Sequence, residues 1–261
     1  MRSRWCIPLA TVALVGGTML AASAAAASTA TPSSGHVTVQ PGGPAGHLTT
    51  PFAVHDGSDT AASSTNWSGY AVHSGTYSSV SASWVEPTGH CTSGTKYSSF
   101  WVGLDGYNSN SVEQTGSEVD CHGSTPKYYS WYEMYPAYPK NFSNAVKPGD
   151  HITGSVTYNG GGKFTLKLSD TTEGWSHTVH KSLGSADRSS AEIIIEAPSS
   201  NTGVLPLADF GKISLSSAKV DGSSIGSLHP TKIIMKSGST TKDSVTALSG
   251  GTNFSATWLH S

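Results

Sequence analysis

From about residue 63 to the C-terminus, hydrophobic and polar residues alternate in short runs without helical periodicity. The runs are rich in Val, Ile, Tyr, Trp and Thr, and Gly, Pro, Asn, Asp and Ser separate them. The pattern predicts strands over residues 66–72, 79–85, 98–105, 111–116, 127–135, 152–158, 164–169, 175–180, 191–197, 212–219 and 233–237. Residues 244–259 alternate more weakly and can add one more strand. So many short strands in one segment indicate an all-β sandwich or barrel.

Strand parity divides three of these segments into an apolar face and a face of aromatic and acidic residues. The apolar faces hold Phe100, Val102 and Leu104 in one segment, and Ile193 and Ile195 in another. The opposite faces carry Trp101, Gly103 and Asp105, then Tyr129, Trp131, Glu133 and Tyr135, and then Glu192, Ile194 and Glu196. Solvent-facing strands are usually rich in Thr, Ser and Lys, so the aromatic and acidic faces indicate a binding surface.

The N-terminus predicts secretion. Arg2 and Arg4 precede an apolar run and small-residue cleavage sites, which is the pattern of a signal peptide over residues 1–27. A membrane anchor is disfavoured because glycines interrupt the run and no basic flank follows it. Residues 28–62 are poor in large apolar side chains, which indicates a propeptide or flexible leader, and this leaves residues 63–261 as one domain.

Charge and cysteine content narrow the possible functions. The chain has 15 Lys and Arg against 17 Asp and Glu, so it lacks the basic stripe expected for nucleic-acid binding. Cys6 leaves with the signal peptide, and in an oxidising compartment Cys91 and Cys121 are expected to form a disulfide. No Cys-x-x-Cys or His-Glu-x-x-His spacing is present, so we expect no metal and no cofactor.

Five motifs carry a family resemblance: Asn66-Trp67-Ser68-Gly69-Tyr70, Phe100-Trp101-Val102-Gly103-Leu104-Asp105-Gly106, Glu113-Gln114-Thr115-Gly116, Trp131-Tyr132-Glu133-Met134-Tyr135-Pro136 and Ala191-Glu192-Ile193-Ile194-Ile195-Glu196. In this order and spacing they resemble the eqolisins, or glutamic peptidases, from about residue 66 to the end of the chain. Each motif alone is a weak signal, and the five in register are a specific one.

The resemblance implies a two-sheet antiparallel β-sandwich of the lectin-like kind, with a concave substrate cleft. It implies a catalytic pair, Gln114 and Glu196, which match the family's glutamine and glutamate. The family positions that line the cleft and bind substrate correspond to Trp101, Asp105, Trp131, Glu133 and Tyr135. The expected protein is a secreted, extracellular, monomeric acid endopeptidase. It acts on proteins or peptides and has no membrane attachment in its mature form.

Three features depart from the family pattern. Ile193 stands where the glutamate block usually has Trp, and Tyr129 stands where fungal members have Asp. The leader contains no Lys or Arg, whereas fungal propeptides are rich in lysine.

The two catalytic groups suffice for hydrolysis without a covalent intermediate. A glutamate carboxylate activates water and returns the proton to the leaving amine, while a glutamine amide donates to the developing oxyanion. An unperturbed glutamate has a pKa of about 4.3, and nearby carboxylates such as Asp105 and Glu133 are expected to raise it. The chemistry therefore predicts an acidic optimum.

Two other function classes remain open. A carbohydrate-binding module or a glycosidase also uses an aromatic sandwich face, and a glycosidase would employ Glu133 and Glu196 as its carboxylate pair. Gly222-Ser223-Ser224-Ile225-Gly226 fits the Gly-x-Ser-x-Gly pattern, but no buried strand and helix flank it as a serine hydrolase requires.

Overall fold

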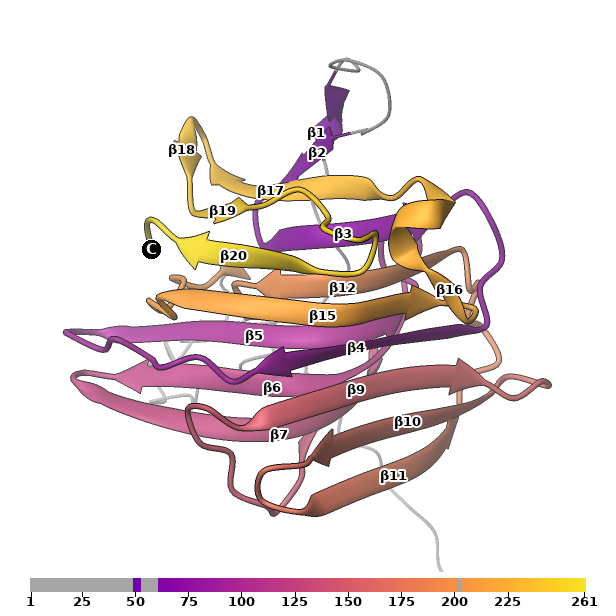
Figure 1. The fold of residues 1–261 in the computed structure, drawn as a ribbon, viewed down its shortest axis with the longest axis horizontal. Coiled ribbons are helices and arrows are strands. Elements are labelled where there is room, and N and C mark those ends of the chain that lie inside the picture. The colour runs from indigo at the N-terminus through magenta and orange to yellow at the C-terminus, as the bar shows by residue number, and fades with distance from the viewer. Residues whose placement is uncertain (1–48, 53–60, 201–202) are drawn as a thin grey trace, which may run out of the picture. The chain divides into compact units, whose positions relative to one another are not determined.

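The computed structural model describes residues 49–52, 61–200 and 203–261. The expected signal peptide (1–27) and nearly all of the expected leader (28–62) lie outside these residues, and both stay predictions. Almost every described element is a β-strand, and the strands form two large sheets (Figure 1).

The first sheet has the strand order β1-β2-β17-β3-β12-β5-β6-β7-β8, and β18 pairs with β17. Its strands are β1 (Thr49–Phe52), β2 (Ala61–Ser64), β3 (Trp67–His73), β5 (Thr95–Leu104), β6 (Val112–His122), β7 (Thr125–Tyr135), β8 (Lys140–Asn141), β12 (Ser190–Glu196), β17 (Thr231–Ser237) and β18 (Thr240–Thr241). The pairs are antiparallel except β2 with β17, which is parallel.

The second sheet has the order β11-β10-β9-β4-β15-β20-β19, and β16 pairs with β15. Its strands are β4 (Ser79–Val85), β9 (His151–Tyr158), β10 (Lys163–Asp170), β11 (Trp175–Ser182), β15 (Lys212–Val220), β16 (Ser223–Ser224), β19 (Asp243–Val245) and β20 (Phe254–Trp258). A small hairpin, β13 (Ser199–Ser200) with β14 (Gly203–Val204), and one 3-10 turn, η1 (Ile225–Leu228), complete the described elements.

The main hydrophobic core lies between the two sheets. Phe100, Val102 and Ile193 of the first sheet belong to one buried cluster with Trp84 and Leu166 of the second. Trp101, Trp131 and Ile194 belong to a separate cluster, which confirms that parity divides these strands into two faces. The predicted all-β sandwich is therefore confirmed, with two predominantly antiparallel sheets.

Most predicted strands differ from the observed ones by one to three residues at an end, and three differences are larger or bear on the site. The segment predicted as 111–116 is longer, because β6 runs over Val112–His122 and pairs with β5 and β7 along its whole length. The strand predicted to include Asp105 ends at Leu104, and Asp105 has a φ of 70°. The tail supplies two strands, β19 and β20, instead of one.

The predicted disulfide is confirmed. Cys91 bonds to Cys121 with a Cα–Cα distance of 5.3 Å, which ties the connection between β4 and β5 to the end of β6. In the parts of the chain that the structure describes, no helix is long and apolar enough to cross a membrane.

Candidate active site

The aromatic and acidic face belongs to five adjacent strands of the first sheet, in the order β3-β12-β5-β6-β7. Strand register places its side chains in rows that cross the sheet. Gln114 lies opposite Gly103 on one side and Glu133 on the other, and Gly103 also lies opposite Glu192. Gly103 has no side chain, so this row presents the side chains of Glu192 on β12, Gln114 on β6 and Glu133 on β7, with an open position on β5.

Glu196 lies in another row of the same face. It pairs with Ser99 and with Trp67, and Ser99 in turn pairs with Glu118. The rows of Gln114 and Glu196 are four residues apart along β5, and Trp101 lies between them. The structure therefore brings Gln114 and Glu196 to one face on either side of a tryptophan.

Two side chains hold the Glu196 carboxylate. Trp101 Nε1 donates to Glu196 Oε2 at 2.7 Å, and Asn66 Nδ2 donates to Oε1 at 3.5 Å. Donors to a carboxylate favour its ionised form. These two contacts fix the position of the one carboxylate that the sequence assigns as the base.

Gln114 is positioned by Glu133. The side-chain amide Nε2 of Gln114 donates to Glu133 Oε2 at 2.7 Å, between neighbouring strands. A primary amide has two N–H groups, so this contact orients the second one and the carbonyl oxygen. Glu133, expected to line the substrate cleft, thus contacts the predicted catalytic glutamine directly.

Glycines make room for the Trp101 ring. A Cβ on Gly116 would lie 2.6 Å from Trp101 Cβ and 2.2 Å from the carbonyl oxygen of Phe100, and a Cβ on Gly103 would lie 2.9 Å from the Trp101 ring. Trp67 packs against the same ring edge-on, with centroids 4.9 Å apart. Gly103 of β5 and Gly116 of β6 therefore leave space for Trp101, the residue that donates to Glu196.

Asp105 was expected to share the face of Trp101, but it lies just beyond the end of β5 and its carboxylate contacts the segment before β12. Its side chain is fully buried and accepts hydrogen bonds from the backbone N–H groups of Arg188 and Ser189 at 2.7 and 2.8 Å, and from the Ser109 hydroxyl. Parity fails here because Asp105 follows the end of β5 with a left-handed backbone. These contacts anchor the segment before β12.

A pair of carboxyl groups on β6 lies in and next to the row of Glu196. Glu118 and Asp120, two residues apart on β6, are 5% and 7% exposed. Burial raises the pKa of Glu118 well above its usual range, and the charges of Asp120 and Glu196 raise it further. Burial raises the pKa of Asp120 to about 6. In acid this pair therefore holds protons and adds little negative charge beside Glu196.

Glu192 is also fully buried. Burial is the largest cause that raises its pKa well above the usual range, and the charges of Asp105 and Glu113 add to it. Hydrogen bonds from the Ser190 side chain and the Tyr107 backbone act in the opposite direction and lower this pKa.

The expected site residues differ in exposure. Trp101, Gln114, Trp131, Glu133 and Glu196 are each 0% exposed, and Tyr135 is half-buried. Within residues 61–200 and 203–261, no group of three His, Cys, Asp or Glu side chains is arranged to hold a metal ion.

Comparisons with known proteins address the family directly. The model of the peptidase A4 family matches residues 65–258, which is most of the chain. This chain belongs to the peptidase A4 family. The resemblance to the glutamic peptidases inferred from the five motifs is therefore confirmed.

One relative agrees with this assignment. Aspergillopepsin-2 of Aspergillus niger is 31% identical over 135 residues, which are 49% of this chain and 48% of that protein. The match thus spans about half the length of this relative.

Two solved structures show the same fold. Scytalido-glutamic peptidase, solved with a transition state analog inhibitor, has a TM-score of 0.66 and 25% identity, covering 75% of this chain and 98% of that one. Aspergilloglutamic peptidase from Aspergillus niger has a TM-score of 0.57 and 25% identity, covering 63% and 99%.

Three residues of this A4 site were not expected from sequence. Asn66 and Trp67 belong to the first family motif, but only the pairing of β3 with β12 reveals that they meet Glu196 and Trp101. Glu118 gives a weak signal, since it shares the parity of Gln114 on β6 but lies beyond the strand as predicted.

Proposed function

We propose that this chain is an acid endopeptidase that hydrolyses peptide bonds in proteins, with Glu196 as the base that activates water and Gln114 as the donor to the oxyanion. The observation that carries the proposal is the position of the two side chains on one sheet face, with Glu196 held by Trp101 at 2.7 Å. Family membership supports the reaction class.

Glu196 performs the proton transfers in this proposal. Its carboxylate takes a proton from a water molecule as the water oxygen attacks the scissile carbonyl carbon. The resulting carboxylic acid then gives that proton to the leaving nitrogen, so Glu196 ends each cycle ionised. Trp101 and Asn66 support this role, because their N–H groups hold the carboxylate in one orientation.

Gln114 stabilises the charge that develops on the carbonyl oxygen. Its amide is held by Glu133 before substrate arrives, and a donor that is already oriented stabilises an oxyanion without reorganisation. The reaction as proposed uses no metal, thiol or serine.

The proposal includes secretion and activation from a longer form. Gln114 and Glu196 are fully buried in the structure, and a peptide must reach both for the reaction to occur. We propose that residues 28–62, whose composition is that of a propeptide or flexible leader, are removed wholly or in part when the protein matures. We further propose that the mature protein is extracellular and monomeric and that its substrates are proteins or peptides.

The experiment is the release of peptides from denatured protein at acid pH by the matured chain. Gln114→Ala and Glu196→Gln should each remove turnover while thermal stability changes little, because each removes a transition-state contact. Glu173→Gln, at an exposed turn, is the matched control and should keep full activity. Wild-type turnover in either site variant would refute the pair, and loss of activity in a chelator restored by zinc would refute a metal-free mechanism.

The same preparation tests the glycosidase alternative. Release of sugars from a polysaccharide that depends on Glu133 and Glu196 but not on Gln114 would favour that class instead. The contact of Glu133 with Gln114 speaks for the peptidase, because it gives Glu133 a partner within the proposed oxyanion site.

A further inference from the structure

The outward face of the second sheet carries an array of hydroxyl groups that the proposed peptidase site does not use. Strands β15, β4, β9, β10 and β11 lie side by side in this order (Figure 1). Their outward positions hold Ser, Thr, Lys and His together with Val85, and none of these positions holds an acidic or aromatic residue. A composition of Ser, Thr and Lys is usual for a solvent-facing sheet; what distinguishes this face is the alignment of its hydroxyls and lysines and a hollow beside them.

Strand register aligns the hydroxyl groups in rows. One row crosses all five strands through successive pairs: Ser216, Ser83, Thr153, Ser169 and Ser176. The hydroxyls of Ser83 and Thr153 are 2.8 Å apart, and those of Ser169 and Ser176 are 2.9 Å apart. Adjacent strands lie about 4.8 Å apart, so the row presents donors and acceptors at a regular spacing.

Lysines flank the next row. Lys219 pairs with Ser81, Ser81 with Ser155, and Ser155 with Lys167. An irregularity in β15 between Ser216 and Lys219, where Ser217 has a φ of 56°, sets this register. The bulge therefore brings a second lysine into line with Lys167 across three strand spacings.

The positive charge of this face is not neutralised. Among residues 61–200 and 203–261, no ion pair reaches the outward lysines Lys163, Lys167, Lys212 and Lys219. Two carboxylates in turns that adjoin these strands have other partners: Asp221, directly after β15, accepts from the backbone of Ser78 and Ser79, and Glu173, between β10 and β11, pairs with Lys147. An anionic partner would find complementary charge here.

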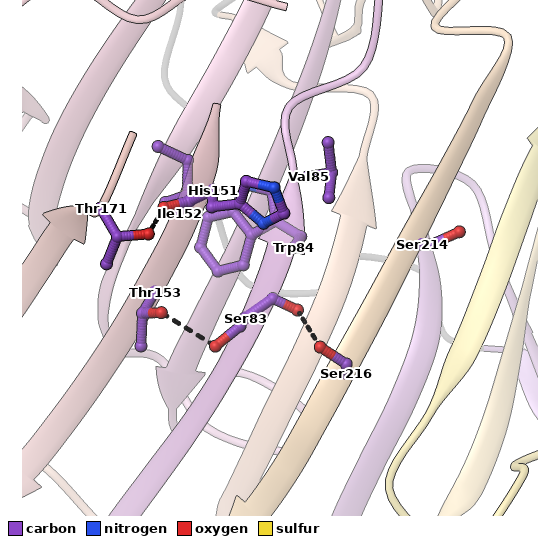
Figure 2. A pocket seen from close by; sticks show the side chains of 9 residues that line it. All are labelled: Ser83, Trp84, Val85, His151, Ile152, Thr153, Thr171, Ser214 and Ser216. Carbon is purple, nitrogen blue, oxygen red and sulfur yellow. Dashed lines mark hydrogen bonds between the residues drawn. The ribbon is translucent and has the colours of Figure 1, made fainter. Parts of the chain in front are cut away.

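A hollow of about 340 Å³ lies at one end of the hydroxyl row (Figure 2). Nine residues line it: five bear hydroxyls, three are apolar and one carries an imidazole (Ser83, Thr153, Thr171, Ser214, Ser216, Trp84, Val85, Ile152 and His151). Small-ligand sites start at about this volume. A hollow of this size can surround one sugar ring of a polysaccharide on several sides, whereas a flat surface would contact only one face of the ring.

We propose that this face binds an acidic polysaccharide, with the hydroxyl row contacting sugar hydroxyls, the hollow holding one sugar unit and the lysines contacting its carboxylate or phosphate groups. A protein interface needs an apolar or aromatic centre, and this face has only Val85. Binding here leaves the proposed peptidase site on the other sheet unobstructed, so the enzyme would work while attached to an acidic glycan.

The test measures binding of the full chain to three soluble polysaccharides: polygalacturonate, its methyl ester and a phosphorylated dextran. The methyl ester keeps the sugar hydroxyls and removes the charge. We expect binding to at least one of the two acidic polymers and weak binding to the ester. The acidic polymer that binds better identifies carboxylate or phosphate as the recognised group.

Variants locate the surface. Lys167→Gln with Lys219→Gln should weaken binding by about tenfold, since two surface charge contacts are removed. Thr153→Val removes one hydroxyl without changing shape and should weaken binding severalfold. The control is Lys140→Gln with Lys236→Gln on the first sheet, which should bind as the wild type does.

Equal binding to the ester, or an equal loss in the control, would overturn the proposal. Peptide cleavage by the same variants is measured separately, so failure of glycan binding is distinct from failure of the peptidase assignment.

Discussion

Gln114 donates its side-chain amide to Glu133 at 2.7 Å across the β6–β7 hairpin. The two-residue turn of Gly123 and Ser124 sets this contact, because it pairs His122 with Thr125. Eight residues back from His122 is Gln114, and eight residues forward from Thr125 is Glu133. The glutamine that is proposed to stabilise the oxyanion is thus oriented by the geometry of one hairpin.

We expect Glu133→Gln to lower kcat by about tenfold or more and to change KM little, because a charge-assisted contact that orients Gln114 is replaced by a weaker neutral one. The measurement is steady-state kinetics with one peptide substrate at acid pH. Glu113→Gln is the matched control, since Glu113 is a buried glutamate next to Gln114 that belongs to the opposite face. A large rise in KM with unchanged kcat would assign Glu133 to substrate binding instead.

The strands and their faces could be predicted from sequence, but the contacts between them could not. Alternation of Ser with Val, Ala and Trp locates β4 at its observed bounds, and strand parity separates Trp101 from Phe100. The second half of β6 was missed because Ser117, Glu118 and Asp120 are polar, and their burial depends on neighbouring strands.

Asp105 shows a different limit of sequence reasoning. Parity holds only while the backbone stays extended, and the left-handed residue at the end of β5 turns its carboxylate toward Arg188 and Ser189. The contact of Asn66 with Glu196 joins residues 130 positions apart, so only the order of β3, β12 and β5 reveals it.

Buried carboxyl groups should make the fold more stable in acid than at neutral pH. Burial between the sheets raises the pKa of Glu86 from 4.5 to about 8, although Ser117 donates to it. Burial likewise raises the pKa of Asp243 to about 7. Below pH 4.5 Glu86 is protonated in both the folded and the unfolded chain, so its contribution is fully present there.

As the pH rises from 4.5 toward 8, the unfolded chain ionises Glu86 and the folded chain does not, so stability falls by about 1.4 kcal/mol per pH unit from this group. Glu86→Gln cannot ionise and should raise the melting temperature at pH 7 while leaving it nearly unchanged at pH 4. Thermal unfolding at both values checks this, with Glu173→Gln as the exposed control. Parallel losses of stability in wild type and Glu86→Gln would show that Glu86 does not carry the effect.

The Cys91–Cys121 disulfide closes a loop that contains β5 and most of β6, with a sequence separation of 30. Loop closure of this size restricts the unfolded chain by roughly 3 to 4 kcal/mol. Replacing both cysteines by Ser should lower the free energy of unfolding by about that amount. Urea unfolding measures it, and hydrogen exchange should show the Gln114 segment loosening first. Two free thiols in the native protein would contradict the bond.

The final prediction separates the two glutamates of β12 that share the site face. Glu192 and Glu196 are four residues apart, about 13 Å along a strand, so they cannot act as the base from the same place. Register favours Glu192, which lies in the row of Gln114, whereas the row of Glu196 is itself four residues from that of Gln114. Hydrogen bonding favours Glu196, because Trp101 and Asn66 donate to its carboxylate. Burial raises the pKa of Glu192, while hydrogen bonds from Ser190 and Tyr107 lower it.

A base must be ionised to accept a proton from water, so we assign that role to Glu196, whose carboxylate accepts from two N–H donors. We expect Glu196→Gln to remove turnover and Glu192→Gln to change activity by less than about tenfold, mainly through KM, since a neutral amide replaces a neutral acid of similar shape. Kinetics on the two single variants with one peptide substrate test this. An inactive Glu192→Gln beside an active Glu196→Gln would reverse the assignment and make the Gln114 row the site of water activation.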